Sequence, residues 1–412
     1  MRIHPVIGCM VLLVSPLSGR SLAAVQVIGR ILVCLGFNLM GGCIYHYDPD
    51  LEGSRDALAI NGKVTDQQGY QYIEISRTAA PYDEDHELPV SGYAVEIQDD
   101  KGNGFPGAEM EPGLYGCWMD QEYLTAGTLY RLLVTNEQGH VYISDFDELL
   151  PCPDIDSITY EVQTMLTEDP DVSYPGLQFF VNTDCSGEYA KYFRWELEET
   201  WEYRSYYEIT CYFEYNEWDW IILTVLGSPS YDYFFCWESG SIPIVYTYST
   251  KHLTSGKITN YPLHFVSSQS DRLSVKYSLL VKQFSLSEQA FQFWHILDEQ
   301  SMQRGELYEK QPAQLSGNIH PQDAGGEPVL GFFYATSIKE KRLFVSPPLR
   351  TLGPDCRHYE TELYRDLIER LLEEYSKVYL VQISPITYHY ADQKCFDCRL
   401  RGGTTERPDF WE

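Results

Sequence analysis

Basic side chains are scarce in this chain of 412 residues. The sequence holds 30 Lys and Arg against 60 Asp and Glu, which gives a formal net charge of −30. Proteins bind nucleic acid and anionic membrane surfaces largely through Lys and Arg, and a strongly negative field repels both. The shortage of basic residues therefore excludes a nucleic-acid-binding protein and a domain that adheres to a membrane by its charge.

The chain also lacks the sequence patterns of common catalytic and cofactor sites. No HExxH, GxSxG, P-loop or EF-hand pattern occurs, and the ten histidines are scattered. The segment KGNGFPG fits G-x-G-x-x-G, but Pro106 prevents the helix that a dinucleotide site needs at its glycines. We therefore predict no catalytic residues, no cofactor and no metal site. Catalytic residues that come together only on folding leave no such pattern. The sequence therefore favours a binding protein but does not exclude an enzyme.

Long apolar runs are missing as well. The first 42 residues contain three Arg and no Asp or Glu, and their apolar run ILVCLGFNLMGG covers only residues 31–42. A membrane-spanning helix needs about 20 apolar residues, whereas this basic, apolar and small-residue order is typical of a secretory signal. Because LMGG before Cys43 resembles a bacterial lipobox, we predict a lipoprotein signal peptide over 1–42 and acylation of Cys43. The alternative is an uncleaved anchor followed by an ordinary cysteine.

Strand-like patterns begin after a short acidic linker at 43–57. Between residues 58 and 150, runs such as YQYIEISR and LYRLLVTN alternate apolar and polar side chains, which predicts a β-sandwich. Asp99–Gly104 and Asn136–Gly139 are rich in Gly, Asn and Asp, which favours hairpin loops. The charged insert at 81–89 is interpreted as a solvated loop, with a cation site as the alternative.

Residues 151–412 are predicted to form a larger β-rich domain with two amphipathic helices. The first helix is expected near 286–302, where SLSE places Ser285 three residues before Glu288 in a capping-box pattern. The second is expected near 360–377, where Leu, Ile and Tyr recur at helical spacing. The sequence thus predicts a mainly β protein.

Eight cysteines remain once the signal peptide and Cys43 are set aside, and an even number in an exported chain favours disulfides. Cys395 and Cys398 form a CxxC near the C-terminus. Half of a zinc site and a redox pair are alternatives, but we expect these two cysteines to bond to each other. The sequence cannot choose the other pairings among Cys117, Cys152, Cys185, Cys211, Cys236 and Cys356.

Aromatic residues gather in one segment. There are 17 among the 46 residues from Tyr192 to Trp237. Aromatic side chains stack on ligands and pack at interfaces, but strand cores also favour them, and the core interpretation has more weight for any single residue. Those that point outward would form a binding surface. Its candidates are Trp195, Trp201, Trp218 and Trp220.

Several segments make the chain resemble a known family. They include LAINGKVTDQQGYQYIEISRT, YFRWELEETWEY and the C-terminal CFDCRLRGGTTERPDFWE. These are similar to a Bacteroidetes lipoprotein family known as domain of unknown function forty-two forty-nine. The resemblance implies an outer-membrane lipoprotein associated with TonB-dependent receptors, and an N-terminal sandwich of immunoglobulin-like or carboxypeptidase-regulatory-like type. It implies no catalytic residues.

We therefore expect a protein anchored at the outer membrane through lipidated Cys43. It would act as a binding or accessory subunit for nutrient uptake with a TonB-dependent receptor. A surface hydrolase acting on glycan or peptide is one alternative, and a structural adhesin or assembly protein is another. The sequence does not identify the ligand.

Overall fold

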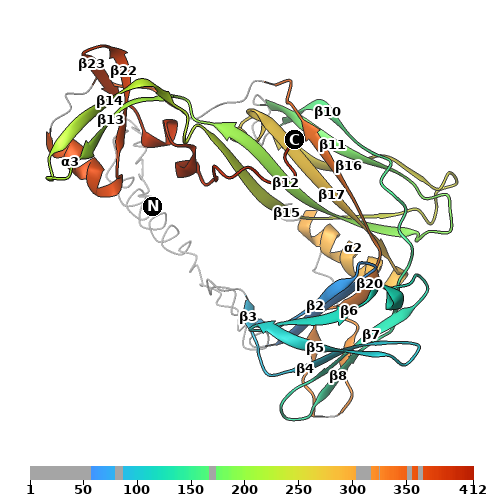
Figure 1. Ribbon diagram of the computed structural model, residues 1–412. Coiled ribbons are helices and arrows are strands. Elements are labelled where there is room, and N and C mark those ends of the chain that lie inside the picture. The colour runs from blue at the N-terminus through green and yellow to red at the C-terminus, as the bar shows by residue number, and fades with distance from the viewer. Residues whose placement is uncertain are drawn as a thin grey trace, which may run out of the picture. The chain divides into compact units, whose positions relative to one another are not determined.

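The computed structural model describes residues 57–78, 87–166, 173–302, 317–323, 325–349, 355–360 and 365–412, and all of them belong to one compact unit, Ser54–Glu412. The predicted signal peptide at 1–42, nearly all of the linker at 43–57 and most of the charged insert at 81–89 lie outside these residues. The described chain is mainly β, as the sequence predicted (Figure 1).

The first part, which we call the sandwich, is a twelve-stranded sheet that encloses one core. Its main strand order is β18-β8-β7-β4-β5-β6-β2-β1-β19, while β20, β3 and β9 pair with β1, β2 and β7. Side chains alternate in and out along the longer strands, so β1, β2, β4, β6 and β7 each place two or more residues in the buried cluster. The strands from residues 58 to 148 are β1 Leu58–Thr65, β2 Gly69–Thr78, β3 Glu87–Pro89, β4 Ala94–Asp99, β5 Gly104–Glu111, β6 Leu114–Met119, β7 Leu129–Thr135, β8 Val141–Ser144 and β9 Asp147–Glu148.

Both expected hairpin loops are present. The β4–β5 loop contains Gly102 with φ of 90°, and the β7–β8 loop contains Gly139 with φ of 88°. Glycine adopts positive φ without a steric penalty, which is why these segments turn where they do. The G-x-G-x-x-G letters therefore belong to a β-hairpin.

The first part is not a continuous stretch of sequence. Three short strands, β18 Ile319–Pro321, β19 Val329–Leu330 and β20 Phe333–Thr336, come from the region that the sequence analysis placed in the second domain. Strand β18 pairs with β8, whereas β19 and β20 both run parallel to β1. Phe333 and Ala335 are fully buried in the core of the first part. The boundary at residue 150 therefore misses three strands.

The second part contains three smaller sheets, of order β10-β11-β16, β15-β12-β17-β21 and β14-β13-β22-β23. The first two enclose a large common core, while the third forms smaller clusters with α3 and the C-terminal segment. The strands are β10 Ser157–Leu166, β11 Ser173–Asp184, β12 Tyr192–Arg204, β13 Ile209–Tyr215, β14 Ile221–Ser230, β15 Phe235–Ser249, β16 Lys257–Ser267, β17 Lys276–Leu286, β21 Ile338–Val345, β22 Val378–Ser384 and β23 Thr387–Tyr390.

Two α-helices occur near the expected positions, α2 at Glu288–Met302 and α3 at Arg365–Glu374. The cap of α2 differs from the prediction, because Ser287 and not Ser285 accepts a hydrogen bond from the backbone N–H of Ala290, at 3.1 Å. In the described part of the chain, neither helix is long and apolar enough to cross a membrane. Short 3-10 turns are η1 Gln121–Tyr123, η2 Asp271–Leu273, η3 Gln393–Cys395 and η4 Cys398–Arg401.

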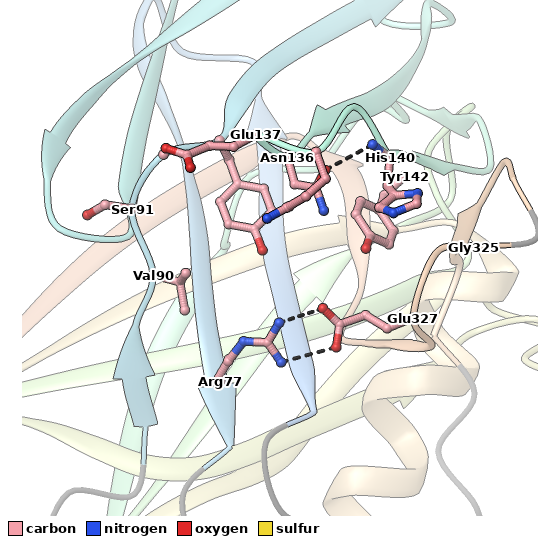
Figure 2. A pocket seen from close by; sticks show the side chains of 12 residues that line it. Arg77, Val90, Ser91, Asn136, Glu137, His140, Tyr142, Gly325 and Glu327 are labelled. Carbon is pink, nitrogen blue, oxygen red and sulfur yellow. Dashed lines mark hydrogen bonds and ion pairs between the residues drawn. The ribbon is translucent and has the colours of Figure 1, made fainter.

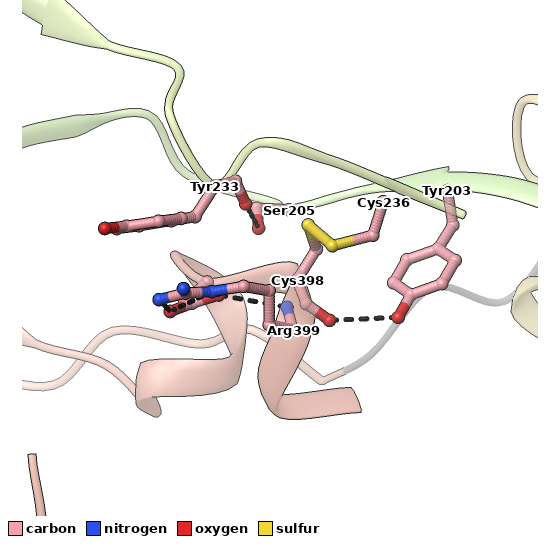
Figure 3. Close-up of polar contacts among 7 residues, drawn as sticks. Tyr203, Ser205, Tyr233, Cys236, Cys398 and Arg399 are labelled. Atoms are coloured by element: carbon pink, nitrogen blue, oxygen red, sulfur yellow. Dashed lines mark hydrogen bonds and ion pairs between the residues drawn. A yellow bond between two sulfur atoms is a disulfide. The ribbon is translucent and has the colours of Figure 1, made fainter. Parts of the chain in front are cut away.

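Cys395 and Cys398 are both disulfide-bonded, but not to each other. Cys398 bonds Cys236 on β15, and Cys395 bonds Cys356. The expected CxxC bridge is therefore wrong: each cysteine of the motif attaches the C-terminal segment to a different part of the chain. Figure 3 shows the bond between Cys236 and Cys398. The remaining cysteines of the described residues, Cys117, Cys152, Cys185 and Cys211, are buried free thiols.

Candidate functional site

Two of the four tryptophans expected at a binding surface belong to the core. Trp195 is fully buried between the two large sheets of the second part, where its Nε1 donates to Gln283 Oε1 at 3.0 Å. Trp201 is half-buried against the same core. Along β12, Phe193, Trp195 and Leu197 all point inward. Strand alternation places Trp195 on the core face of β12, so it contributes nothing to an outward surface.

Trp218 and Trp220 are instead the most exposed tryptophans in the described chain, at 70% and 71%. They lie in the loop that joins β13 to β14. Asn216 Oδ1 accepts the backbone N–H groups of both, at 3.0 Å and 2.9 Å. These bonds order the loop backbone, and both indoles project from it into solvent. We call this loop the tryptophan hairpin.

A different group of aromatic residues lines a hollow beside the sandwich. It has a volume of about 560 Å³ and lies where β1, β2 and β20 of the first part approach β12 and α2. Helix α2 packs on β12, β15 and β17, which places its aromatic side chains against this hollow. We call it the aromatic pocket. Its lining residues are Asn61, Gly62, Lys63, Tyr72, Glu74, Arg194, Glu196, Phe293, Trp294, Leu297, Phe332 and Tyr334.

Arg194 forms the polar centre of the aromatic pocket. It points away from the core because it alternates with Phe193 and Trp195, yet it is buried. Its guanidinium lies 3.6 Å from the centroid of the Trp294 ring and donates to the Tyr334 hydroxyl at 3.1 Å and to Glu196 at 2.6 Å. Stacking and charge-assisted bonds together hold the group in one orientation.

The charges in the aromatic pocket compensate one another. Lys63 lies 3.7 Å from the Glu196 carboxylate and 4.8 Å from the ring centroid of Phe284. Burial lowers the pKa of Lys63, while the nearby Glu196 acts in the opposite direction. Burial also raises the pKa of Tyr334 to about 12, so its hydroxyl stays protonated at neutral pH. Both cations of the pocket are thus paired with a single carboxylate.

Two donors at the wall of the pocket are unsatisfied. Arg194 Nε and Trp294 Nε1 are buried and have no hydrogen-bond partner among the described residues. A buried donor without an acceptor costs about 1–3 kcal/mol. Both atoms are covered by neighbouring protein atoms, so this cost is local to the wall of the pocket.

A second hollow, of about 430 Å³, lies between β2, the β7–β8 hairpin and the segment around Glu327. Figure 2 shows Arg77 and Glu327 facing each other across it, with nitrogen to oxygen distances of 3.1 Å and 2.5 Å. Its arginine is occupied by this bidentate pair, and its lining is mostly polar. We interpret the Arg77–Glu327 pair as a structural contact that joins β2 to the segment around Glu327. The aromatic pocket is therefore taken as the candidate site.

The sequence did not predict the aromatic pocket. Its residues come from four segments, near positions 61–74, 194–196, 293–297 and 332–334, which folding alone brings together. One sequence feature could have pointed to it. Arg194 and Glu196 alternate with the large aromatic core residues of β12 and therefore lie on the opposite face of the strand. No group of His, Cys, Asp or Glu among the described residues is arranged to hold a metal ion.

Fold and pocket define a mainly β protein with an aromatic pocket between its sandwich and its second β-rich part. The chain belongs to the family described as Domain of unknown function (DUF4249), whose model matches residues 44–342. The match ends within β21, so the C-terminal segment with Cys395 and Cys398 lies beyond it. No curated protein matches the chain.

Two solved structures show limited similarity. Trypsin-activated alpha-2-macroglobulin from Escherichia coli is 12% identical over 57% of this chain and 15% of its own, with a TM-score of 0.19. A DUF4785 family protein from Legionella pneumophila is 13% identical over 55% of this chain and 52% of its own, with a TM-score of 0.14. The chain thus spans about half or less of the length of either protein.

Proposed function

We propose that this chain is a lipid-anchored binding protein of the outer membrane that serves as an accessory subunit of a TonB-dependent receptor in nutrient uptake. The aromatic pocket is the single observation that carries the binding role. Membership of the family and the lipobox-like sequence before Cys43 support the location. The tryptophan hairpin supplies a second surface, separate from the pocket, for a protein partner.

The aromatic pocket has the features of a small-molecule site. Its volume of about 560 Å³ falls within the usual range for such sites, about 300–1,000 Å³. Rings from Phe293, Trp294 and Phe332 supply apolar area, and Arg194 is already fixed by three neighbours. A preorganised site loses less entropy on binding, which favours affinity.

The tryptophan hairpin is suited to contact a partner protein. Exposed tryptophans are frequent among the residues that dominate interface energies. The loop carries Glu217 and Asp219 but no Lys or Arg, so it has no electrostatic attraction to an anionic lipid surface. We therefore place the contact with the receptor at Trp218 and Trp220.

The anchoring is tested by replacing the acylated residue. We expect Cys43→Ala to abolish incorporation of a labelled fatty acid into the protein, because one cysteine carries the lipid. Mass spectrometry of the wild-type N-terminus should detect acylated Cys43. An unmodified Cys43 that still follows residues 1–42 would contradict the anchoring.

The accessory role is tested by capture from solubilised outer membranes. A tagged full-length chain should recover a TonB-dependent receptor, and the double variant W218A/W220A should recover at least tenfold less. Ile386→Ala is the matched control, since Ile386 is 89% exposed and lies in the β22–β23 turn. The register places that turn at the opposite end of the sheet, because Phe213 near the end of β13 pairs with Val378 at the start of β22. Failure of the wild-type chain to recover any receptor would reject the accessory role.

A further inference from the structure

The outer face of the sandwich carries a row of aromatic side chains that leads to the aromatic pocket. On β2, Tyr70, Tyr72 and Glu74 point outward, while Gln71 and Ile73 between them are buried. Trp118 on β6 lies directly opposite Tyr70 in the sheet register. Tyr70, Tyr72 and Trp118 are 45%, 50% and 48% exposed, which is unusual for three neighbouring large rings.

The three rings form one continuous surface. The centroids of Tyr70 and Trp118 are 5.1 Å apart in an edge-to-face arrangement, and those of Tyr70 and Tyr72 are 6.3 Å apart. Gly116 lies opposite Tyr72, and a Cβ at this glycine would come within 3.0 Å of the Tyr70 ring. The missing side chain therefore gives the Tyr70 ring room to lie over the sheet.

This row continues into the aromatic pocket. Tyr72 belongs both to the row and to the lining of the pocket, and Glu74, two residues further along β2, also lines the pocket. Asn61, also in the lining, pairs with Glu74 across β1 and β2. The exposed rings and the pocket are therefore adjacent parts of one surface, and an extended ligand can contact both.

The charges along this surface select an uncharged ligand. The pocket lining contains two basic residues, Lys63 and Arg194, and two acidic ones, Glu74 and Glu196. Both basic residues are paired with Glu196, so an anionic ligand would have to compete with that carboxylate. The whole chain is also strongly negative, at −30. A polyanion is therefore disfavoured at the site and along its approach.

Polar groups beside the rings favour a hydroxyl-rich ligand over an apolar one. Asp120 accepts hydrogen bonds from Trp118 Nε1 at 3.0 Å and from Gln68 Nε2 at 3.4 Å. The row therefore has the carboxylates of Asp120 and Glu74 and the amide of Asn61 as polar neighbours. A lipid would cover these groups without bonding them, which is unfavourable. A sugar places the C–H groups of its ring against an aromatic face and its hydroxyls against such polar neighbours.

We propose that the row of Tyr70, Tyr72 and Trp118 and the aromatic pocket form one site for a neutral oligosaccharide. This inference rests on the proposed binding function and names its ligand class. The sugar chain lies along the row and places one end in the pocket.

The test uses the purified mature chain and calorimetric titration with a defined panel. The neutral probes are hexasaccharides of β-1,4-glucose, α-1,4-glucose, β-1,4-xylose and β-1,4-mannose. The charged probe is a hexamer of galacturonate, and the apolar probe is a fatty acid. We expect at least one neutral hexasaccharide to bind, to quench tryptophan fluorescence, and to bind at least tenfold more tightly than the charged and apolar probes.

Variants then locate the binding. Y70A/W118A and Y72A should each weaken binding at least tenfold, while Tyr231→Ala, an exposed tyrosine on the β14–β15 connection, should leave it unchanged. All of these side chains are exposed, and thermal unfolding checks that each variant folds. Absence of binding to all four neutral probes, or equal binding by Y70A/W118A, would overturn the proposal. So would self-association that Y70A/W118A abolishes without any saccharide binding.

The two proposals fail separately. Receptor capture depends on the tryptophan hairpin, so Y70A/W118A should still recover the receptor. Normal capture with no saccharide binding would reject the oligosaccharide site alone. Saccharide binding without receptor capture would reject the accessory role and leave the site in place.

Discussion

Asp147 is a single residue that connects the sandwich to the segments that complete it. It lies on β9, is buried, and accepts the backbone N–H of Ala335 on β20 at 2.9 Å. Burial raises the pKa of Asp147 to about 6, although bonds from Ser287 and Ala335 act in the opposite direction. Since Ser287 caps α2, this one carboxyl contacts both β20 and the start of the helix.

The pKa of Asp147 predicts how stability depends on pH. Its folded-state pKa lies above the ordinary value of 3.8, so the folded protein holds a proton that the unfolded chain has lost. As pH rises from about 4 to about 6, the wild type should therefore lose up to about 3 kcal/mol of unfolding free energy relative to Asp147→Asn. Urea unfolding of both proteins at half-unit pH steps measures the difference. Parallel stability curves for the two proteins would contradict it.

At the scale of elements, the local sequence predicts type and position well and boundaries less well. The alternation of apolar and polar residues predicted the strands between residues 58 and 150, and apolar residues at helical spacing predicted both helices. Both patterns can be recognised locally because each depends only on neighbouring residues. The cap of α2 was misplaced because SLSE contains two serines. Ser285 is still part of β17, paired with Phe193, and its hydroxyl donates to the Leu150 carbonyl at 2.6 Å. Only the tertiary pairing decides which serine is free to cap.

The C-terminal segment is held to the second part by several contacts near one disulfide. Beside Cys236–Cys398, the Tyr203 hydroxyl donates to the Cys398 carbonyl at 2.9 Å (Figure 3). It also accepts the Gly403 N–H at 2.9 Å, and the Arg399 guanidinium lies 3.7 Å from the centroid of Tyr233. The sequence could not show this arrangement, because the two bonded cysteines are 162 residues apart.

Removing that disulfide should release the segment. We expect the double variant C236S/C398S to lose up to about 4–5 kcal/mol of stability, since the bond closes a long loop in the unfolded chain. The matched control is C356S/C395S. The bond that it removes spans only 39 residues, so this variant should lose about 1 kcal/mol less unfolding free energy than C236S/C398S. Limited trypsin digestion should cut C236S/C398S rapidly after Arg399 and Arg401. Equal digestion of wild type and this variant would show that the non-covalent contacts suffice.

At the scale of the whole molecule, the sandwich depends on strands that lie far away in the sequence. Strands β18 and β20 place Ile319, Phe333 and Ala335 in its core, and Val329 of β19 packs against it. Two- to four-residue strands carry almost no periodicity, which is why the sequence assigned this region to the second domain. The aromatic pocket was missed for the same reason, since it exists only after residues 332–334 reach the sandwich.

A fragment covering residues 57–156 should therefore not fold by itself. It lacks the strand beside β1 and three core side chains, so part of its apolar core would be exposed. We expect no cooperative urea transition by circular dichroism. Joining residues 317–338 to the fragment through a flexible linker should restore the transition. A cooperative transition of the unextended fragment would show that β1 to β9 are sufficient.

The parallel pairing of β1 with β20 also sets an order of events during synthesis. Val64 and its partner Ala335 are separated by more than half of the chain, so β1 and its neighbour β2 leave the ribosome long before β20 exists. Contacts between such distant segments form slowly. The first strand to be made is thus among the last to be completed, and the nascent chain stays incompletely folded until most of it has been translated.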